Sequence, residues 1–376
     1  MTRHLLAGIG LVLTSTAWAA SAPRYTVEFL ADLPGGIASS QGMAINAQGL
    51  VGGQSVAADG YFATTWAAPS RTPLSLGDLP GGYTSSMVYA INDVGTTAGT
   101  GGASSGSGRA FRRTAGGAMV DLGDLPGGSN ASGAWAINNA GVVVGYSYSS
   151  LSGGNPTAVV WAPGAAALDL GDLPGSYYSS QAKAINDAGA VAGVGAAATG
   201  KHAFLWTAGG GMVDLGDLAG GMDMSESTGI NEQGWVVGYG TGGNANGGAG
   251  TLHATLWRDG QIIDLGSGNV TSNAQDVNNR GQIVGAHNYR ATLWGANQQL
   301  LDLNTLVEGL PFGTVLATAM SINDAGQITG WANSAGGGRV GYVLTEISAV
   351  PEPGSWALML AGLLATGTLA RRRRRD

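Results

Sequence analysis

A single motif returns seven times along this chain, and its spacing limits the folds that the chain can adopt. The fullest copy is residues 121–138, DLGDLPGGSNASGAWAIN, and its last tripeptide returns with small changes every 45 to 48 residues. A repeat of this length is one supersecondary unit that buries its apolar face against its neighbours. Each copy ends on an asparagine, called the marker asparagine below: Asn46, Asn92, Asn138, Asn186, Asn231, Asn278 and Asn323.

Each repeat contains four short runs with the signature of β-strands, as the fourth copy illustrates. The runs are residues 180–186 (SQAKAIN), 190–195 (AVAGVG), 202–206 (HAFLW) and 212–218 (MVDLGDL). In each run, apolar and polar residues alternate or most residues are apolar, and glycine or asparagine stands at the ends. No helical periodicity of useful length occurs between residues 23 and 349. A glycine three residues after the marker asparagine predicts a hairpin turn between the first two runs. We therefore expect an all-β body.

The order of the runs favours a closed ring. Four antiparallel strands in about 46 residues make one blade of a β-propeller, whose blades have ~40–50 residues. The chain opens with residues 25–33, which align with the fourth run, and its last repeat ends at residues 341–344, which align with the third. The N-terminal strand can then complete the last blade and remove two open sheet edges. The sequence predicts a seven-bladed β-propeller over residues 23–349; a β-solenoid is the alternative.

Composition fits an exported protein that holds together by packing alone. The 376 residues include 67 glycines and no cysteine; 44% of the residues are hydrophobic and 11% are charged. The apolar fraction is enough for a core, and a surface of Gly, Ser, Asn and Thr suits the outside of a cell. The net charge of −7 argues against a nucleic-acid partner, because phosphates require clustered Lys and Arg.

Residues 1–22 have the pattern of a secretory signal peptide. Arg3 and His4 precede an apolar stretch at residues 5–13. Small residues at 17–19 (Ala-Trp-Ala) and 20–22 (Ala-Ser-Ala) then offer two sites for signal peptidase. We expect this segment to be removed on export.

Two polar positions recur in the segment that leads from one blade to the next. An aspartate stands 14 residues before the marker asparagine in five repeats, and a serine stands six residues before it in six repeats. If the first run is innermost, these side chains form two rings around one mouth of the channel, where they could bind glycan hydroxyls or a calcium ion. Alternatively, they bond local backbone N–H groups. The residues are Asp32, Asp78, Asp124, Asp172 and Asp217, with Ser40, Ser86, Ser132, Ser180, Ser225 and Ser272.

The third run and the loop before it offer two further candidates. Insertions fall in that loop at residues 151–156 and 241–250, and variable loops on a rigid scaffold often carry specificity, although they also serve as linkers. The third run carries a tryptophan in five repeats. We interpret these tryptophans as core residues between blades; the alternative is a ring of sugar-stacking platforms. They are Trp66, Trp161, Trp206, Trp257 and Trp294.

The body shows no catalytic motif. Its three histidines are His202, His253 and His287, and the first two occupy the same repeat position, which favours a structural role. We find no metal-ligand spacing, nucleophile elbow or phosphate loop, although carboxylates from different blades could pair for glycoside cleavage. We expect no enzyme activity, no catalytic or metal-binding residues and no cofactor.

The motifs AINDAG, VVG, HAFLW and M-x-DLGDL together resemble the HAF family of extracellular repeats, and residues 202–204 spell that name. The resemblance covers residues 25 to about 344. It implies an exported repeat protein and implies no particular activity.

Residues 350–376 form a separate module. Pro351, Glu352 and Pro353 precede an apolar stretch at residues 356–370, and five arginines follow, beginning with Arg371, Arg372 and Arg373. As a helix the stretch spans ~22 Å, short of a ~30 Å hydrocarbon core, with its basic end on the cytoplasmic side. The order of these three features, a Pro-Glu-Pro motif, a short apolar stretch and a basic end, closely resembles the PEP-CTERM sorting signal. That resemblance implies a Gram-negative host and cleavage by an exosortase-type peptidase; the alternative is a plain transmembrane anchor.

These observations predict an exported, non-catalytic repeat protein at the cell surface or in the biofilm matrix, in a structural or glycan-binding role. Its regions are a signal peptide (1–22), a propeller (23–349) and a sorting segment (350–376). Expected partners are signal peptidase, the exosortase-type peptidase and, transiently, the inner membrane, followed by exopolysaccharide or surface proteins. The alternatives are a carbohydrate-active propeller, either a glycosidase or a lyase, and a protein-interaction propeller in surface assembly.

Overall fold

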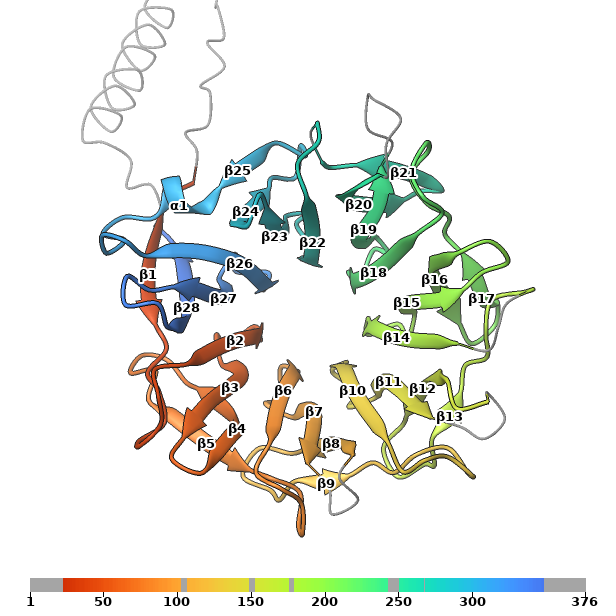
Figure 1. Ribbon diagram of the computed structural model, residues 1–376, viewed down its shortest axis with the longest axis horizontal. Coiled ribbons are helices and arrows are strands. Elements are labelled where there is room, and N and C mark those ends of the chain that lie inside the picture. The colour runs from red at the N-terminus through yellow and green to blue at the C-terminus, as the bar shows by residue number, and fades with distance from the viewer. Residues whose placement is uncertain are drawn as a thin grey trace, which may run out of the picture.

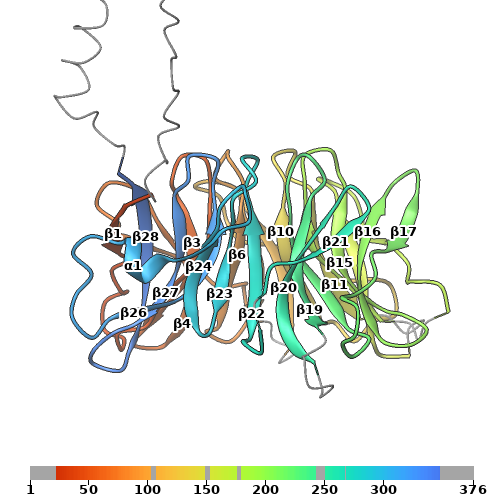
Figure 2. The same ribbon diagram turned by 90° about the horizontal axis from the view of Figure 1, so that it is seen from above.

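The computed structural model describes residues 23–102, 107–148, 153–175, 179–242, 250–266 and 268–347. These residues form seven four-stranded antiparallel sheets around a central channel (Figure 1). From the side, the ring is a flat disc (Figure 2). The predicted seven-bladed propeller is therefore confirmed. The predicted signal peptide and sorting segment lie outside the described residues, as does most of the insertion at 241–250.

In each blade the strands follow one another from the channel to the rim. Blade 1 contains β2 (Ser40–Ile45), β3 (Val51–Ala57), β4 (Gly60–Trp66) and β5 (Pro73–Gly77). Blade 2 contains β6 (Ser86–Ile91), β7 (Thr97–Gly102), β8 (Gly108–Arg113) and β9 (Val120–Asp121). Blade 3 contains β10 (Ser132–Ile137), β11 (Val143–Tyr148), β12 (Pro156–Trp161) and β13 (Leu168–Asp169).

The next three blades repeat this order. Blade 4 contains β14 (Ser180–Ile185), β15 (Val191–Ala196), β16 (Lys201–Thr207) and β17 (Gly211–Asp214). Blade 5 contains β18 (Ser225–Ile230), β19 (Val236–Gly242), β20 (Thr251–Arg258) and β21 (Gln261–Asp264). Blade 6 contains β22 (Ser272–Val277), β23 (Ile283–His287), β24 (Arg290–Trp294) and β25 (Leu300–Asp302), and the one-turn helix α1 (Leu303–Leu306) follows it.

Blade 7 joins the two ends of the described chain. It contains β26 (Val315–Ile322), β27 (Ile328–Asn333) and β28 (Arg339–Glu346), and β1 (Tyr25–Phe29) pairs antiparallel with β28 as its outermost strand. The backbone N–H of Ile347 donates to the carbonyl of Arg24 over 2.7 Å. The predicted ring closure by the N-terminal strand is thus confirmed.

The two faces of the disc carry different connections. The turns that follow the seven marker asparagines lie on one face, called the turn face. The loops between blades, and those between the second and third strands of each blade, lie on the opposite face, called the loop face. In blade 7 the third strand runs from the loop face to the turn face, so both Arg24 and Ile347 lie on the turn face.

The core lies between the blades. Among the described residues, the buried apolar side chains form seven clusters, one for each pair of neighbouring blades. Trp66, Trp161 and Trp294 are at most 1% exposed, Trp257 is 4% exposed, and Trp206 packs against the cluster between blades 3 and 4. The recurring tryptophans are therefore core residues, as expected, and the sugar-platform alternative is wrong.

Candidate functional site

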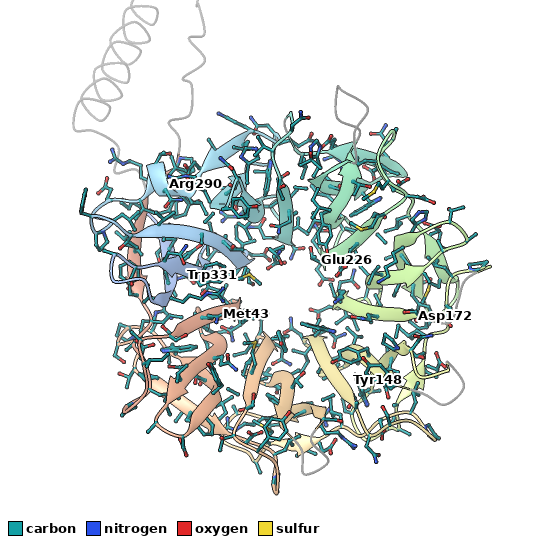
Figure 3. The ribbon with its side chains drawn as sticks, viewed as in Figure 1. Met43, Tyr148, Asp172, Glu226, Arg290 and Trp331 are labelled. Carbon is teal, nitrogen blue, oxygen red and sulfur yellow. The ribbon has the colours of Figure 1, made fainter. Side chains whose placement is uncertain are left out.

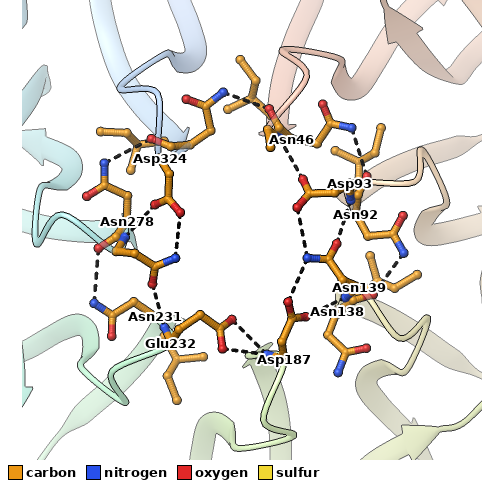
Figure 4. Close-up of a pocket in the computed structure, with 18 of the residues that line it drawn as sticks. Asn46, Asn92, Asp93, Asn138, Asn139, Asp187, Asn231, Glu232, Asn278 and Asp324 are labelled. Atoms are coloured by element: carbon orange, nitrogen blue, oxygen red, sulfur yellow. Dashed lines mark hydrogen bonds between the residues drawn. The ribbon is translucent and has the colours of Figure 1, made fainter.

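On the turn face, the marker asparagines form a closed ring of hydrogen bonds around the channel (Figure 4). Each side-chain amide donates to the backbone carbonyl of the marker asparagine in the next blade, over 2.9 to 3.2 Å, and Asn323 returns to Asn46. The side-chain oxygen accepts the N–H of the residue four positions later, as from Val142 to Asn138. Each asparagine therefore stabilises both its own turn and the contact between two blades.

The residues after the marker asparagines form a second ring at the same mouth, nearer to the channel axis (Figure 4). Four of these residues are acidic, Asp93, Asp187, Glu232 and Asp324, and they accept hydrogen bonds from neighbouring backbone N–H groups or from Asn139 and Asn279. In blade 1 the position holds Ala47, which has no acceptor side chain. The turn-face mouth, with a cavity of about 210 Å³, is therefore acidic and polar.

The six recurring serines do not surround the channel mouth as expected. They are at most 2% exposed, because each lies where the innermost strand of one blade meets the outer strands of the previous blade. The Ser86 hydroxyl, for example, donates to the carbonyl of Gly77 and accepts the N–H of Ala63. Equivalent contacts to the preceding blade hold Ser40, Ser132, Ser180, Ser225 and Ser272. These hydroxyls join neighbouring blades.

None of the five recurring aspartates lines a channel cavity in the described part of the chain, and Asp172 lies away from the channel, near the outer edge of the disc (Figure 3). Asp32 accepts the N–H of Ser39, and Asp78 accepts those of Ser85 and Gly102. Asp124 lies 3.8 Å from Arg109, and burial raises the pKa of Asp172. Asp217 belongs to the histidine cluster described next. A ligand-binding role for this ring stays a prediction.

Acidic side chains surround His202 in blade 4. Its Nδ1 lies 2.8 Å from Asp214 and its Nε2 lies 2.7 Å from Asp223. Ligand atoms of His202, Asp217 and Asp223 lie within 4.8 Å of one another, a spacing that a metal ion could bridge. His253 in blade 5 makes the matching bond to Asp264 and a second one to the carbonyl of Gly268. The recurring histidine therefore ties the third strand of a blade to its fourth.

The innermost strand of every blade contains a β-bulge three residues before the marker asparagine. A bulge changes the direction of one side chain. It also explains the recurring glycine of the second strand: a Cβ atom on Gly145 would collide with the carbonyl of Gly133. All seven bulged residues line one cavity of about 260 Å³ in the channel: Met43, Tyr89, Trp135, Lys183, Thr228, Gln275 and Met320.

This channel pocket differs chemically from one side to another, although the scaffold around it repeats. Glu226 and Tyr239 of blade 5 complete its lining, and Figure 3 shows Met43 and Glu226 at the channel. Glu226 accepts a 2.8 Å hydrogen bond from the Tyr239 hydroxyl and lies 3.4 Å from the Lys183 ammonium. Burial, followed by the charge of Glu226, raises the pKa of Tyr239, so this phenol stays protonated and donates.

The other side of the channel pocket is aromatic. The ring centroids of Tyr89 and Trp135 lie 4.5 Å apart, and the Lys183 ammonium lies 4.4 Å from the centroid of Trp135. Lys183 therefore joins the aromatic side to the polar side. A cationic group over an indole ring and a nearby carboxylate together fix the orientation of a small polar ligand.

Asp276 is a second carboxylate in the channel, one layer closer to the turn face. It accepts hydrogen bonds from the Ser321 hydroxyl, over 2.8 Å, and from the N–H groups of Ile322 and Val277. Burial raises the pKa of Asp276, and these hydrogen bonds offset part of that shift. Its oxygens are therefore directed towards blade 7 and its own backbone.

No recurring residue of the sequence marks the channel pocket, so the predicted sites do not include it. The sequence does contain a signal: in the innermost strand, the residues three and five before the marker asparagine differ in nearly every repeat. In a regular strand, side chains alternate between the two faces of the sheet. The bulge interrupts this alternation, so the spacing of the residues does not predict that the bulged side chain points into the channel.

The C-terminal segment matches a known sorting signal. Residues 349–375 match the PEP-CTERM protein-sorting motif. This confirms the resemblance noted in the sequence, and it indicates export by way of a membrane-anchored intermediate and processing by an exosortase-type system. No helix within the described part of the chain has both the length and the apolar character needed to cross a membrane.

Solved structures similar to this chain are also propellers of low sequence identity. A gluconolactonase from Xanthomonas campestris is 14% identical, with a TM-score of 0.38, over 86% of this chain and 94% of that one. A lectin from Burkholderia pseudomallei is 9% identical, with a TM-score of 0.43, over 88% and 97%. No curated protein matches the chain. At these values, the likeness carries no conclusion about activity or ligand.

Proposed function

We propose that this protein is an exported, non-catalytic propeller that binds a sugar unit of a surface or matrix glycan in its channel pocket. The observation that carries the proposal is the set of seven bulged side chains, which brings a highly variable position of the repeat to one cavity. Function on a repeated scaffold is expected where the repeats differ, since shared positions serve the scaffold.

The pocket has the size and chemistry for one sugar ring. Its volume of about 260 Å³ lies just below the ~300–1,000 Å³ of pockets for drug-sized ligands. Tyr89 and Trp135 offer apolar faces for the C–H side of a sugar, while Lys183, Glu226 and Gln275 offer donors and acceptors for hydroxyls.

Glycan arrays and calorimetry on residues 23–349 test this proposal. We expect binding of at least one neutral or acidic glycan in the micromolar to millimolar range, and a loss of about tenfold or more for Trp135→Ala and Glu226→Gln. Asp93→Asn, in the acidic ring at the turn-face mouth, is the matched control and should bind the glycan as tightly as the unchanged protein does. Equal binding by Trp135→Ala would place the ligand outside the channel pocket.

The second candidate is a carbohydrate-active enzyme, because Glu226 and Asp276 come from neighbouring blades and both line the channel. The raised pKa of Asp276 suits a general acid. Its bonds to Ser321, Ile322 and Val277 direct it away from the pocket, which favours binding without cleavage. Product analysis of each bound glycan separates the two: shortened products that vanish in Asp276→Asn would establish the enzyme.

We further propose that the mature protein reaches the cell surface or matrix after the sorting segment is removed. The match at residues 349–375 supports this route. Replacing Pro351, Glu352 and Pro353 by alanine should leave the uncleaved protein in the inner-membrane fraction, as measured by fractionation and immunoblotting. Release of this variant at the normal rate would contradict the route.

A further inference from the structure

The aromatic side of the channel pocket continues out of the channel as a row of rings. Ring centroids lie 4.5 Å apart from Tyr89 to Trp135, 6.2 Å from Trp135 to Tyr146, and 5.9 Å from Tyr146 to Tyr148. Tyr148 is the last residue of β11, so it lies at the loop-face end of blade 3. The four rings therefore lead from the pocket to the loop face.

A departure from the repeat makes room for this row. Gly133 occupies a position that carries a side chain in the other six blades, namely Gln41, Met87, Gln181, Glu226, Asn273 and Thr318. Gly133 pairs with Tyr146, and a Cβ atom on Gly133 would lie 2.6 Å from Cε1 and 2.9 Å from Cζ of that ring. The Tyr146 ring thus lies over bare backbone, in a place that a side chain would block.

The rings of the row carry no charge that would disfavour stacking of a sugar. Burial raises the pKa of Tyr89, and burial followed by the neighbouring Tyr148 and Tyr89 raises the pKa of Tyr146. Both phenols therefore stay neutral at physiological pH. Neither Tyr146 nor Tyr148 is fully buried. Each keeps exposed surface that a sugar ring can stack on.

We propose that the channel pocket holds the terminal sugar of a linear glycan, and that Tyr146 and Tyr148 carry the next sugars towards the loop face. This inference rests on the proposed function, because it assumes that the pocket binds a sugar. The pocket has room for about one sugar ring, and the aromatic row gives the rest of the chain a path out of it. The partner is therefore a polysaccharide read from its end.

Chain-length dependence of binding tests the inference. The probes are β-1,4-linked glucose, N-acetylglucosamine and mannuronate oligosaccharides of one to six units, measured by calorimetry against residues 23–349. For a probe that binds, we expect affinity to rise about two- to tenfold for each of the second and third units and then to level off.

Variants assign those steps to particular rings. Tyr148→Ala should lose the gain from the outer unit, and Tyr146→Ala should lose both gains, while the affinity for the single sugar stays within about twofold. Gly133→Gln, which introduces the residue found in blades 1 and 4, should displace Tyr146 and reproduce the Tyr146→Ala result. Tyr289→Ala is the control, because Tyr289 is 80% exposed in blade 6 and lies outside the row.

The outcomes separate this inference from the proposed function. Equal affinity for all chain lengths, or an unchanged length dependence in both Tyr146→Ala and Tyr148→Ala, would overturn the aromatic path and leave the pocket as the binding site. Binding that Trp135→Ala does not weaken at any length, or no binding of any probe, would overturn the proposed function and the path with it.

Discussion

At the residue scale, the two hydrogen-bonding roles of the marker asparagine explain why this residue recurs in all seven repeats. Its oxygen holds the turn and its amide reaches the next blade, and the two bonds lie in a buried place where water cannot replace them. The recurring serine makes a similar link on the other side of each blade. In six of the seven repeats, two small polar residues therefore add hydrogen bonds between blades to the apolar contacts, in a protein without cysteine.

Removing one marker asparagine should cost considerable stability. Asn138→Ala removes one of the two hydrogen bonds to the carbonyl of Asn186 and leaves the N–H of Val142 without its acceptor, so we expect the free energy of unfolding to fall by about 2–4 kcal/mol. Denaturant unfolding measures this. Asn139→Ala changes the adjacent, exposed residue and should cost less than about 1 kcal/mol. Equal losses for the two variants would contradict a special role for the ring.

His202 should make stability depend on pH. Burial lowers the pKa of His202, but hydrogen bonds and charge from Asp214 and Asp223 outweigh it, so the pKa in the folded protein is raised. The charged form therefore stabilises the fold: this contribution is complete below the usual pKa of ~6.5 and is lost as pH rises through the raised value. We expect the melting temperature to fall more steeply from about pH 6 to pH 9 than in His202→Gln.

If the two proteins show parallel pH profiles, the acidic cluster does not act through His202. Asp217 also approaches this cluster, so Asp217→Asn is a useful comparison. It removes one nearby negative charge and keeps both hydrogen bonds of the histidine. Because Asp214 and Asp223 raise the pKa of His202, the pH dependence should persist in this variant.

At the element scale, the bulged innermost strand separates scaffold from site. The strand keeps its recurring Asn, Ser and apolar residues in the blade, while the bulge directs one residue per blade into the channel. The recurring glycine of the second strand is required by the bulge, because the bulge brings a backbone carbonyl to the place that a Cβ atom on this residue would occupy. Variation at the bulged residue therefore changes the channel without changing the blade.

Adding one methyl group opposite a bulge should disturb both stability and the site. In Gly145→Ala the new Cβ collides with the carbonyl of Gly133, so we expect a loss of about 1–3 kcal/mol and a displaced Trp135 with altered indole fluorescence. Gly209→Ala is the control, because a Cβ there meets nothing within 4 Å. Unfolding curves and emission spectra of both variants check this. Unchanged spectra in Gly145→Ala would mean that the bulge tolerates a side chain.

At the scale of the whole molecule, the ring closes through its N-terminal strand and is secured from the next blade. β1 pairs with β28, and the Arg71 guanidinium, whose side chain is 5% exposed, lies 2.8 Å from Glu28 of β1. The indole N–H of Trp66 donates to the carbonyl of Ala31. Blade 1 therefore holds the strand that completes blade 7.

Deleting β1 should open the ring, whereas moving it should not. A variant without residues 23–33 exposes the edge of β28, and we expect a lower melting temperature and dimers or larger species by light scattering. A circular permutant that joins Ile347 to Arg24 by a short linker and opens the chain at residues 35–36 keeps every strand pair. It should stay monomeric and melt close to the unchanged protein; a deletion variant that does the same would refute closure by β1.

The sequence allowed the fold to be predicted because the repeat carries it. The marker asparagine, the glycine of the turn and the displaced first strand are all visible as spacing, and together they define blades and ring closure. The site was harder to predict. Ser86 recurs and looked functional, but it lies in a contact between blades, whereas Trp135 and Lys183 meet only because a bulge turns each of them into the channel.

Arg24 and Ile347 leave the disc from the turn face, and this gives the molecule a direction. The asparagine ring and its carboxylates lie on this same face. The loop face, with Tyr148 at its edge, carries neither Arg24 nor Ile347. A tag or partner fused closely to Ile347 would therefore crowd the acidic mouth of the channel and leave the loop face open.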